Sequence, residues 1–176
     1  MPSEVIIPGF TATILLLMIT LSITGVITTS LSFTVNTLRE AYESYRKRLN
    51  RVLISWASLE YDGGMLRGEI IVYNDGSQPV YRFNTCDLII EYYSASGVFR
   101  SLRLNYPVEW LVERVYLVED YSVEFAEHPS IGQGEAGLIR VSITVSDIDV
   151  SKPVRIVFTT DLGASATKWV LINVES

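Results

Sequence analysis

The sequence predicts a mainly β protein in which an N-terminal transmembrane helix with a coiled extension precedes an immunoglobulin-like antiparallel β-sandwich. Three observations lead to this prediction. A long segment near the N-terminus has no charged residue, a heptad pattern of apolar residues follows it, and short segments with alternating apolar residues fill the rest of the chain. We therefore expect residues 1–51 to form a transmembrane anchor and helical stalk, and residues 52–176 to form the β-sandwich domain.

The first expected element is a membrane-spanning helix. No Asp, Glu, Lys or Arg lies between Glu4 and Arg39, a gap of 34 positions. A helix needs about 20 apolar residues to cross the hydrocarbon core of a bilayer, and residues 6–31 satisfy this length. A buried helix of a soluble domain would need a second apolar helix to cover it. A cleaved secretory signal would carry a basic residue before its apolar core. The sequence shows neither, so we expect an anchor that stays on the protein.

The second expected element is a helical stalk. Residues 31–52 contain no Gly or Pro, and their apolar members follow one another at alternating steps of four and three, which is the a/d pattern of a coiled coil. We expect the helix to leave the membrane without a break. The apolar positions are candidate oligomer contacts, and the alternative is that they pack on the chain's own β domain. They are Leu31, Val35, Leu38, Tyr42, Tyr45 and Leu49, and the pattern continues to Val52.

From residue 52 the apolar pattern has a period of two, with many β-branched and aromatic residues. Clusters of Gly, Pro, Asn and Asp separate the segments, as reversals of the chain require. Seven or eight short strands without a helical pattern among them predict a two-sheet sandwich of the immunoglobulin type. The Cys…Trp…Cys signature of antibody domains is missing, so the likeness is architectural. The predicted strands are residues 52–61, 66–74, 85–93, 98–104, 111–119, 138–145, 154–160 and 168–174.

The residue content points to a structural or binding protein and not to an enzyme. One histidine, His128, and one cysteine, Cys86, cannot close a structural zinc site or a disulfide. Cys86 lies in an apolar run and is expected to be a small core residue, whereas His128 precedes a proline in an expected exposed turn. We find no phosphate-binding glycine loop between a strand and a helix. We therefore expect no catalytic, cofactor-binding or metal site.

Four aspartates near the expected loops leave calcium open as an alternative, because oxygen-rich loops hold this ion. The other interpretation is that they are solvated loop acids, since the sequence lacks the glycine and distal glutamate of an EF-hand. These residues are Asp120, Asp147, Asp149 and Asp161. Tyr and Trp are enriched in protein interfaces, so the ten tyrosines and Trp56, Trp110 and Trp169 are either contact or core residues.

Charge divides the chain. The formal net charge is −6, but residues 39–51 carry +3 and residues 52–176 carry −8. An acidic domain disfavours nucleic acid as a partner, because it repels phosphate. The basic cluster at residues 46–48 either contacts anionic lipid headgroups or pairs with acids of its own domain. Taken alone, a basic flank after the span places the domain in the cytoplasm.

The whole layout resembles the archaellum (archaeal flagellum) stator proteins, the flagellar proteins F and G. The resemblance covers essentially the full chain. It is carried by the uncharged span after PSEVI at residues 2–6, and by three later turns, VYNDGS at residues 72–77, PSIGQGE at residues 129–135 and TTDLG at residues 159–163. The size of the sandwich and its turns favour the F type over the G type.

The resemblance implies a role in motility. A stator protein of this family is expected to keep its β-sandwich outside the cytoplasmic membrane, in the pseudo-periplasm, and to bind the surface-layer protein. The rotary motor then has a fixed point to push against. Membrane lipid and another stator subunit are the further partners expected, in a homo- or hetero-oligomer. The basic cluster begins about two helical turns beyond Leu31, which weakens its force as a topology signal.

Two alternatives remain at this stage. A filament subunit of the archaeal type IV pilin or archaellin kind also joins an apolar helix to a β domain, but it is cut from a basic leader and often glycosylated. This sequence has neither that leader nor an Asn-x-Ser/Thr sequon. An anchored extracytoplasmic module that binds a ligand, such as calcium or a sugar, is the second alternative.

Overall fold

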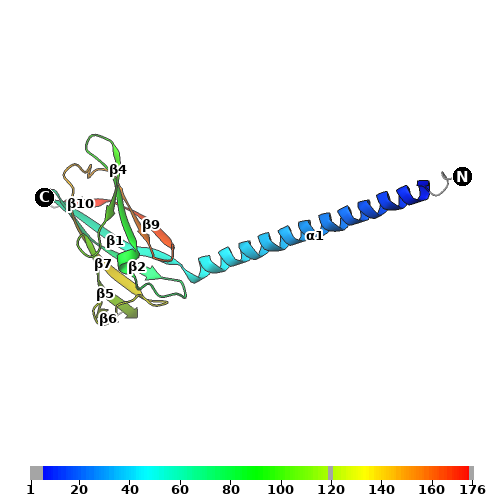
Figure 1. Ribbon diagram of the computed structural model, residues 1–176. Coiled ribbons are helices and arrows are strands. Elements are labelled where there is room, and N and C mark those ends of the chain that lie inside the picture. Colours follow the sequence, from blue (N-terminus) through cyan, green and yellow to red (C-terminus); the bar gives the residue numbers. More distant parts are fainter. Residues whose placement is uncertain (1–5, 119–120, 175–176) are drawn as a thin grey trace. The chain divides into compact units, whose positions relative to one another are not determined.

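The computed structural model describes residues 6–118 and 121–174 (Figure 1). The chain divides between Tyr45 and Arg46 into two units, the first formed by the greater part of helix α1 and the second by its last turn and the strands. Helix α1 covers Ile6–Leu49, and a 3-10 helix covers Phe83–Thr85.

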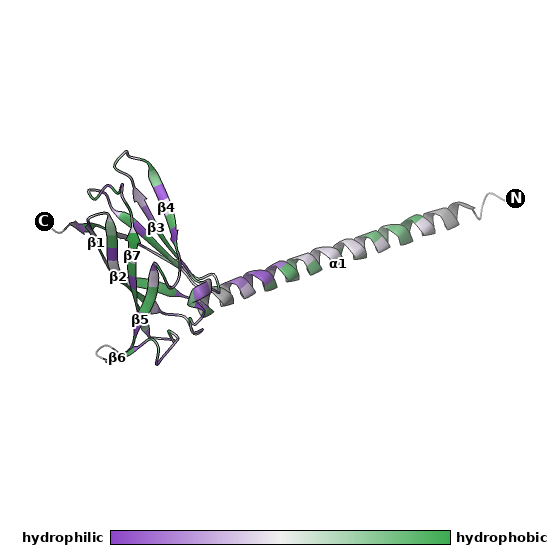
Figure 2. Cartoon of the chain, turned by 60° about the vertical axis from the view of Figure 1, so that its left-hand side comes forward, coloured by the Kyte–Doolittle hydropathy of each residue, from purple (hydrophilic) through white to green (hydrophobic). Residues whose placement is uncertain are grey.

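Helix α1 is 44 residues long and has no interruption. The prediction of a continuous helix is therefore confirmed. Thr13–Tyr45 is long and apolar enough to cross a membrane, with none of it buried against protein. Figure 2 shows hydrophobic residues in its N-terminal part and hydrophilic residues toward Leu49. α1 is thus a candidate membrane span.

The threonines of α1 do not oppose a place in lipid. The hydroxyls of Thr20, Thr24 and Thr28 each donate to the carbonyl oxygen four residues earlier, at 2.7 to 2.8 Å. A polar group in the bilayer core needs a partner within the protein, because water is absent there. These bonds supply that partner inside the helix itself.

The strands form two sheets, as predicted. The six-stranded sheet has the order β10-β1-β2-β7-β5-β6, and the four-stranded sheet has the order β4-β3-β8-β9. The first contains β1 (Val52–Asp62), β2 (Met65–Asn74), β5 (Trp110–Val118), β6 (Tyr121–Glu124), β7 (Ala136–Thr144) and β10 (Ile172–Val174). The second contains β3 (Asp87–Tyr93), β4 (Phe99–Leu104), β8 (Val154–Thr159) and β9 (Ser165–Val170).

The strand order identifies the architecture as immunoglobulin-like. The run β1-β2-β7-β5 has the A-B-E-D order of one immunoglobulin sheet, and β4-β3-β8-β9 has the C′-C-F-G order of the other. Neighbouring strands are antiparallel, except that β10 pairs in parallel with β1. The predicted fold class is confirmed.

The core lies between the sheets and is built from the inward residue of each alternating pair. Trp110 on β5 is 1% exposed and its ring meets that of Phe158 on β8 edge to face, with centroids 6.1 Å apart. Its indole N–H donates to the carbonyl oxygen of Leu104 at 3.2 Å, so the buried polar atom is satisfied. Cys86 is buried, as predicted, and burial raises the pKa of its thiol to about 11.

Four sequence predictions were wrong in detail. The strand predicted at 168–174 is two strands in different sheets, because the chain crosses between the sheets at the exposed Leu171. Strand β6 was missed, since four residues give too short a pattern. The heptad pattern ends at Leu49, three residues before the predicted Val52, because α1 stops at Leu49 and Val52 begins β1 with its side chain buried. The predicted start at Thr85 belongs to the 3-10 helix.

Candidate interaction surfaces

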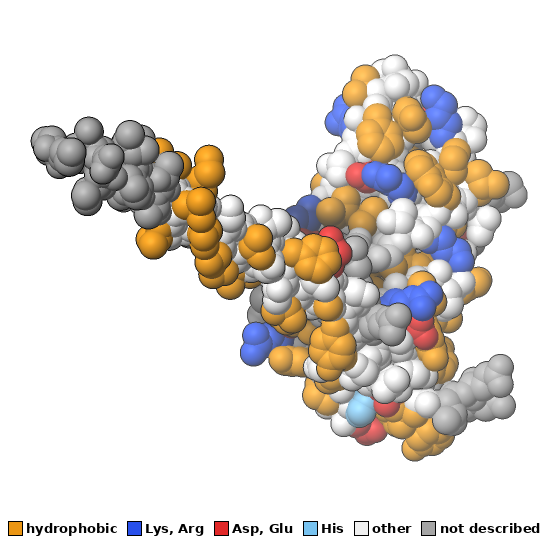
Figure 3. Space-filling model, turned by 90° about the vertical axis from the view of Figure 1, so that its right-hand side faces the viewer, with side chains coloured by type: hydrophobic (Ala, Val, Ile, Leu, Met, Phe, Trp, Pro, Cys, Tyr) orange, Lys and Arg blue, Asp and Glu red, His pale blue; other side chains and the backbone are white. Residues whose placement is uncertain are grey.

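The heptad stripe of α1 presents apolar side chains on the surface of the first unit. Five of its members are 56–66% exposed: Leu31, Val35, Leu38, Tyr42 and Tyr45. Figure 3 shows hydrophobic side chains on the surface of the helix. The sixth, Leu49, is half-buried and belongs to the second unit. Oligomer contact through these residues stays a prediction.

The charges beside this stripe are of one sign. With Val35 and Tyr42 at position a, the flanking e and g positions hold Ser32, Thr34, Arg39, Ala41, Arg46 and Arg48. The acids Glu40 and Glu43 fall at positions away from the stripe, where Glu43 forms an exposed ion pair with Arg39 at 3.2 Å. The flanks therefore carry only basic charge.

The turn that follows β2 holds the end of α1. The backbone N–H groups of Asp75 and Gly76 donate to the carbonyl oxygen of Arg51 at 2.9 and 2.8 Å, and that of Gln78 donates to Leu49 at 3.1 Å. Arg51 and Asp75 also form an ion pair at 3.0 Å. We call residues 49–51 and 74–78 the helix clasp; both parts belong to the second unit.

Two residues of the clasp, Asn74 and Gly76, are required by their surroundings. Asn74 is 1% exposed; its amide N–H donates to the carbonyl oxygens of Gln78 and Ile131 at 2.8 and 2.9 Å, while its side-chain oxygen accepts from Gly76 at 3.0 Å. A Cβ on Gly76 would lie 2.4 Å from the carbonyl oxygen of Leu49. Only glycine fits there, because a backbone atom occupies the space of a side chain.

The turn at residues 129–135 is hydrogen-bonded to the clasp and is itself held by Glu135. Glu135 accepts from the backbone N–H of Gly132 at 2.6 Å, and its carboxylate lies 2.9 Å from the ring Nε2 of His128. The backbone of Glu135 accepts from the N–H of Asn74 at 2.9 Å. His128, predicted in an exposed turn, is therefore only partly exposed and has a carboxylate partner.

Two of the turns that carry the family resemblance, at residues 72–77 and 159–163, line one small cavity of about 10 Å³ together with residues 50–52. The third turn, at residues 129–135, does not line this cavity but is hydrogen-bonded to Asn74 of the clasp. The lining residues of the cavity are Asn50, Arg51, Val52, Asn74, Gln78, Pro79, Val80, Thr160, Asp161, Leu162 and Ala164. The sequence showed these stretches as separate turns, and it contained no signal that they converge.

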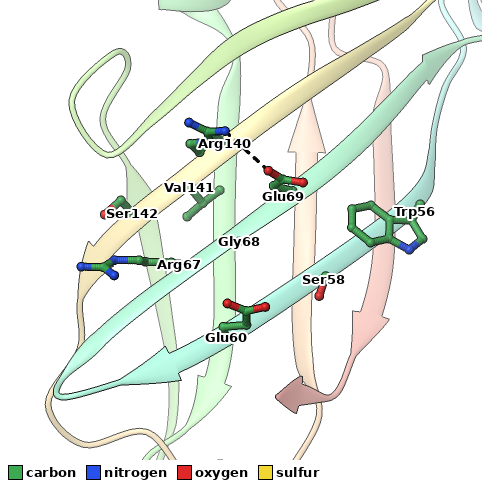
Figure 4. Close-up of a pocket in the computed structure, with 9 residues that line it drawn as sticks. All are labelled: Trp56, Ser58, Glu60, Arg67, Gly68, Glu69, Arg140, Val141 and Ser142. Carbon is green, nitrogen blue, oxygen red and sulfur yellow. Dashed lines mark ion pairs between the residues drawn. The ribbon is translucent and has the colours of Figure 1, made fainter. Parts of the chain in front are cut away.

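A larger hollow lies on the outer face of the six-stranded sheet (Figure 4). Its volume is about 530 Å³. Strand β1 contributes Trp56, Ser58 and Glu60, while β2 and β7 contribute two arginines, a glutamate and a serine: Arg67, Glu69, Arg140 and Ser142. The short side chains and Gly68 leave room between the longer ones. We call this the sheet hollow.

The charges of the sheet hollow are only partly paired. Arg140 lies 2.8 Å from Glu113 and 3.6 Å from Glu69. The contact with Glu113 lacks hydrogen-bond geometry, so it is electrostatic only. Glu60 and Arg67 stand opposite each other in the β1–β2 register, yet neither side chain has a hydrogen bond or ion pair in the part of the chain that is described.

The outer face of the four-stranded sheet is arranged differently. Arg155 forms an ion pair with Glu91 and also lies over the ring of Trp169, 5.7 Å from its centroid. The rings of Tyr93 and Phe99 contact each other at a centroid distance of 5.1 Å, and the Lys152 ammonium lies 4.7 Å from the centroid of Tyr93. The aromatic and charged side chains of this face are partners of one another.

The candidate calcium acids that lie within the described residues form no shared metal site. Among the described residues, no group of three or more His, Cys, Asp and Glu side chains is placed to hold a metal ion. Asp147 pairs with Arg100 at 2.8 Å. The Ser151 hydroxyl donates to Asp149 at 2.6 Å and, with its backbone N–H, lowers the pKa of that carboxyl. Asp161 lines the clasp cavity, and Asp120 lies outside the described residues.

Comparison with known proteins gives structural neighbours only. No protein-family model and no curated protein matches the chain. The archaellum periplasmic stator complex of FlaF and FlaG from Sulfolobus acidocaldarius is similar over 69% of this chain and 90% of that chain, with 13% identity and a TM-score of 0.46. FlaG of that organism gives the same identity and TM-score, over 69% and 100%.

A β-sandwich protein from Clostridium difficile 630 is also similar, with 18% identity and a TM-score of 0.29, over 69% of this chain and 82% of that chain. The first two structural neighbours are archaellum stator proteins, the family named from the sequence.

Proposed function

We propose that this chain is a membrane-anchored stator component of the archaellum motor, with its β-sandwich domain outside the cytoplasm, where it binds the surface layer. The helix clasp is the observation that carries this proposal. Two of the three turns by which the sequence resembles archaellum stator proteins line one cavity with residues 50–52, and the third is hydrogen-bonded to Asn74 beside them. The resemblance therefore centres on the segment that directly follows α1.

The clasp suits a protein that transmits force. A single helix in a fluid bilayer drifts, so a stator needs both an attachment outside the membrane and a firm connection to it. Here α1 continues to Leu49 without a break, and residues 49–51 are held to the domain by three backbone hydrogen bonds and one ion pair. Each such hydrogen bond contributes about 0.5–1.5 kcal/mol. A flexible linker would lack these bonds.

The heptad stripe supplies the contact to another stator subunit. Membrane insertion makes neighbouring anchors parallel, and in a parallel coiled coil the e and g positions of the two helices meet. In two copies of this chain, those positions would set Arg39 opposite Thr34 and Arg46 opposite Ala41, so that no arginine meets an acid. A partner helix with acidic flanks fits better, which favours a hetero-oligomer.

The mass of the complex in detergent tests this contact. We expect the chain alone to be monomeric and to form a heteromer when a second stator subunit is added. Leu38→Lys should abolish the heteromer, whereas Glu40→Lys, on the side away from the stripe, should leave it. A stable homodimer that Leu38→Lys dissociates would contradict the acidic partner. A heteromer unaffected by Leu38→Lys would contradict the stripe.

Co-sedimentation tests the proposed function itself. The full chain in lipid nanodiscs is mixed with purified surface-layer sheets and pelleted at low speed. We expect saturable capture of the nanodiscs. Capture no greater than that of nanodiscs with an unrelated single-span protein would overturn the proposal.

A further inference from the structure

We propose that the sheet hollow is a binding site for a neutral saccharide. The proposal does not depend on the motor role, because it rests on the sandwich domain alone. The ring of Trp56 is the stacking platform. Glu60 and Arg67 are the principal hydrogen-bonding groups, with Glu69, Arg140 and two serines around them.

Trp56 is turned outward by an irregularity in its own strand. The pairing of β1 with β2 shifts register between Ile54 and Trp56, which marks a β-bulge. Bulges re-aim side chains and are frequent beside binding sites. The bulged Ser55 is fixed by two bonds, since its hydroxyl donates to Ile71 at 3.2 Å and its carbonyl oxygen accepts from Lys168 at 2.6 Å. The outward placement of Trp56 is thus built into the strand.

The indole ring of Trp56 is the exposed aromatic group of the sheet hollow. Trp56 is 46% exposed and makes no aromatic or cation–π contact among the described residues. A tryptophan combines a large apolar face with a polar N–H at its edge. The flat C–H face of a sugar ring fits such a surface, while its hydroxyls remain free to bond with neighbouring groups.

Glu60 and Arg67 supply matching hydrogen-bonding capacity. Opposite charges that face each other across two strands ordinarily form a pair, but these two side chains do not. Glu60 therefore keeps acceptor oxygens, and Arg67 keeps guanidinium donors. Adjacent sugar hydroxyls can donate to the first and accept from the second. An apolar ligand could not form hydrogen bonds with either the Glu60 acceptors or the Arg67 donors.

The charge balance selects a neutral ligand. Two glutamates and two arginines line the hollow, so its formal charges cancel. The domain around it carries −8, which repels phosphorylated and polyanionic ligands. The volume of about 530 Å³ lies within the range of about 300–1,000 Å³ typical of small-molecule sites.

The position on a sheet face disfavours an extended peptide. Peptides that add to β-sheets pair with an open strand edge through backbone hydrogen bonds. The hollow lies over β1, β2 and β7, and β2 is paired on both sides. Its recognition groups are therefore side chains, as in the recognition of a polyol.

The test uses the full chain in detergent, with tetrasaccharides of mannose, glucose and N-acetylglucosamine as probes at concentrations up to the millimolar range. Binding is followed by tryptophan fluorescence and by isothermal titration calorimetry. We expect saturable binding of at least one probe. Trp56→Ala should weaken it at least tenfold.

Trp169→Ala is the matched control, because Trp169 is exposed to a similar extent on the other sheet. We expect it to change the affinity less than twofold. Ser142→Arg fills the hollow without removing Trp56, so it should also abolish binding. It gives an independent test in case Trp56→Ala does not fold. Absence of saturable binding to every probe, or binding that survives both Trp56→Ala and Ser142→Arg, would overturn the proposal.

Discussion

The two outer faces of the sandwich use the same kinds of side chain in opposite ways. On the four-stranded sheet, Glu91, Arg155 and Trp169 satisfy one another. On the six-stranded sheet, Glu60, Arg67 and Trp56 lie in one hollow and make no such contacts within the described residues. The comparison teaches that exposed charge and aromatic content are shared by both faces. The proposed saccharide site rests on the groups that have no internal partner within the described residues.

The polar groups of the helix clasp are hydrogen-bonded to one another, as those of the four-stranded sheet are paired. A substitution in the clasp should therefore have the largest effect on stability. Gly76→Ala places a Cβ against backbone atoms of residues 49 and 51 that cannot move without opening the clasp. We expect the free energy of unfolding to fall by about 3 kcal/mol, as in severe overpacking. Urea unfolding of the full chain in detergent measures it. The neighbouring Ser77→Ala, at an exposed position, should change it by less than about 0.5 kcal/mol.

Asn74→Ala should have the next largest effect. It removes three hydrogen bonds, while the carbonyl of Ile131 keeps its bond from the backbone N–H of Val80. A hydrogen bond contributes about 0.5–1.5 kcal/mol, so we expect a loss of about 2 kcal/mol in the same urea titration. Asn173→Ala is the control, because this exposed amide makes one long contact of 3.4 Å. Equal losses for the two variants would refute the role of the clasp.

The two faces are compared directly by removing one arginine from each. Arg155→Ala breaks the pair with Glu91 and the contact with Trp169, so it should lower the free energy of unfolding by a small but measurable amount. Arg67→Ala breaks no protein contact and should leave the free energy of unfolding within about 0.5 kcal/mol of the original. A larger loss for Arg67→Ala than for Arg155→Ala would invalidate the distinction between the faces.

The smallest expected effect is a pH dependence at Asp149. Hydrogen bonds from Ser151 hold the folded-state pKa of this carboxyl below its ordinary value. Its contribution to stability is therefore present above the ordinary pKa and is lost as pH falls through the folded-state pKa. In Ser151→Ala the pKa should move upward, so that the loss begins at a higher pH. Titration of the Asp149 carboxyl by NMR measures the shift, and an unchanged pKa would contradict the assignment.

The elements of the fold could be predicted because each leaves a local pattern. The charge-free stretch and the absence of Gly and Pro in residues 31–52 indicate a continuous helix. Alternation over six to eleven residues indicates most of the strands. The crossing at Leu171 was missed because the alternating apolar pattern continues where the chain passes from one sheet to the other. Strand β6 was missed because four residues are too few to show an alternating pattern.

The sites could not be predicted in the same way, because they depend on contacts between distant residues. Asn74 and Gly76 mark a turn in the sequence, but their contact with residues 49 and 51 appears only in the fold. Glu60 lies opposite Arg67 through the β1–β2 register, which the bulge after Ile54 shifts. The oligomer stripe and the topology of the membrane span remain predictions.

The mobility of the full chain in the membrane of living cells tests the stator role most directly. Single-particle tracking of a fluorescent fusion measures the lateral diffusion coefficient before and after removal of the surface layer. A protein braced against that layer should diffuse at least tenfold more slowly while the layer is present, and an unrelated single-span protein should change little. Equal, free diffusion in both states would contradict the role.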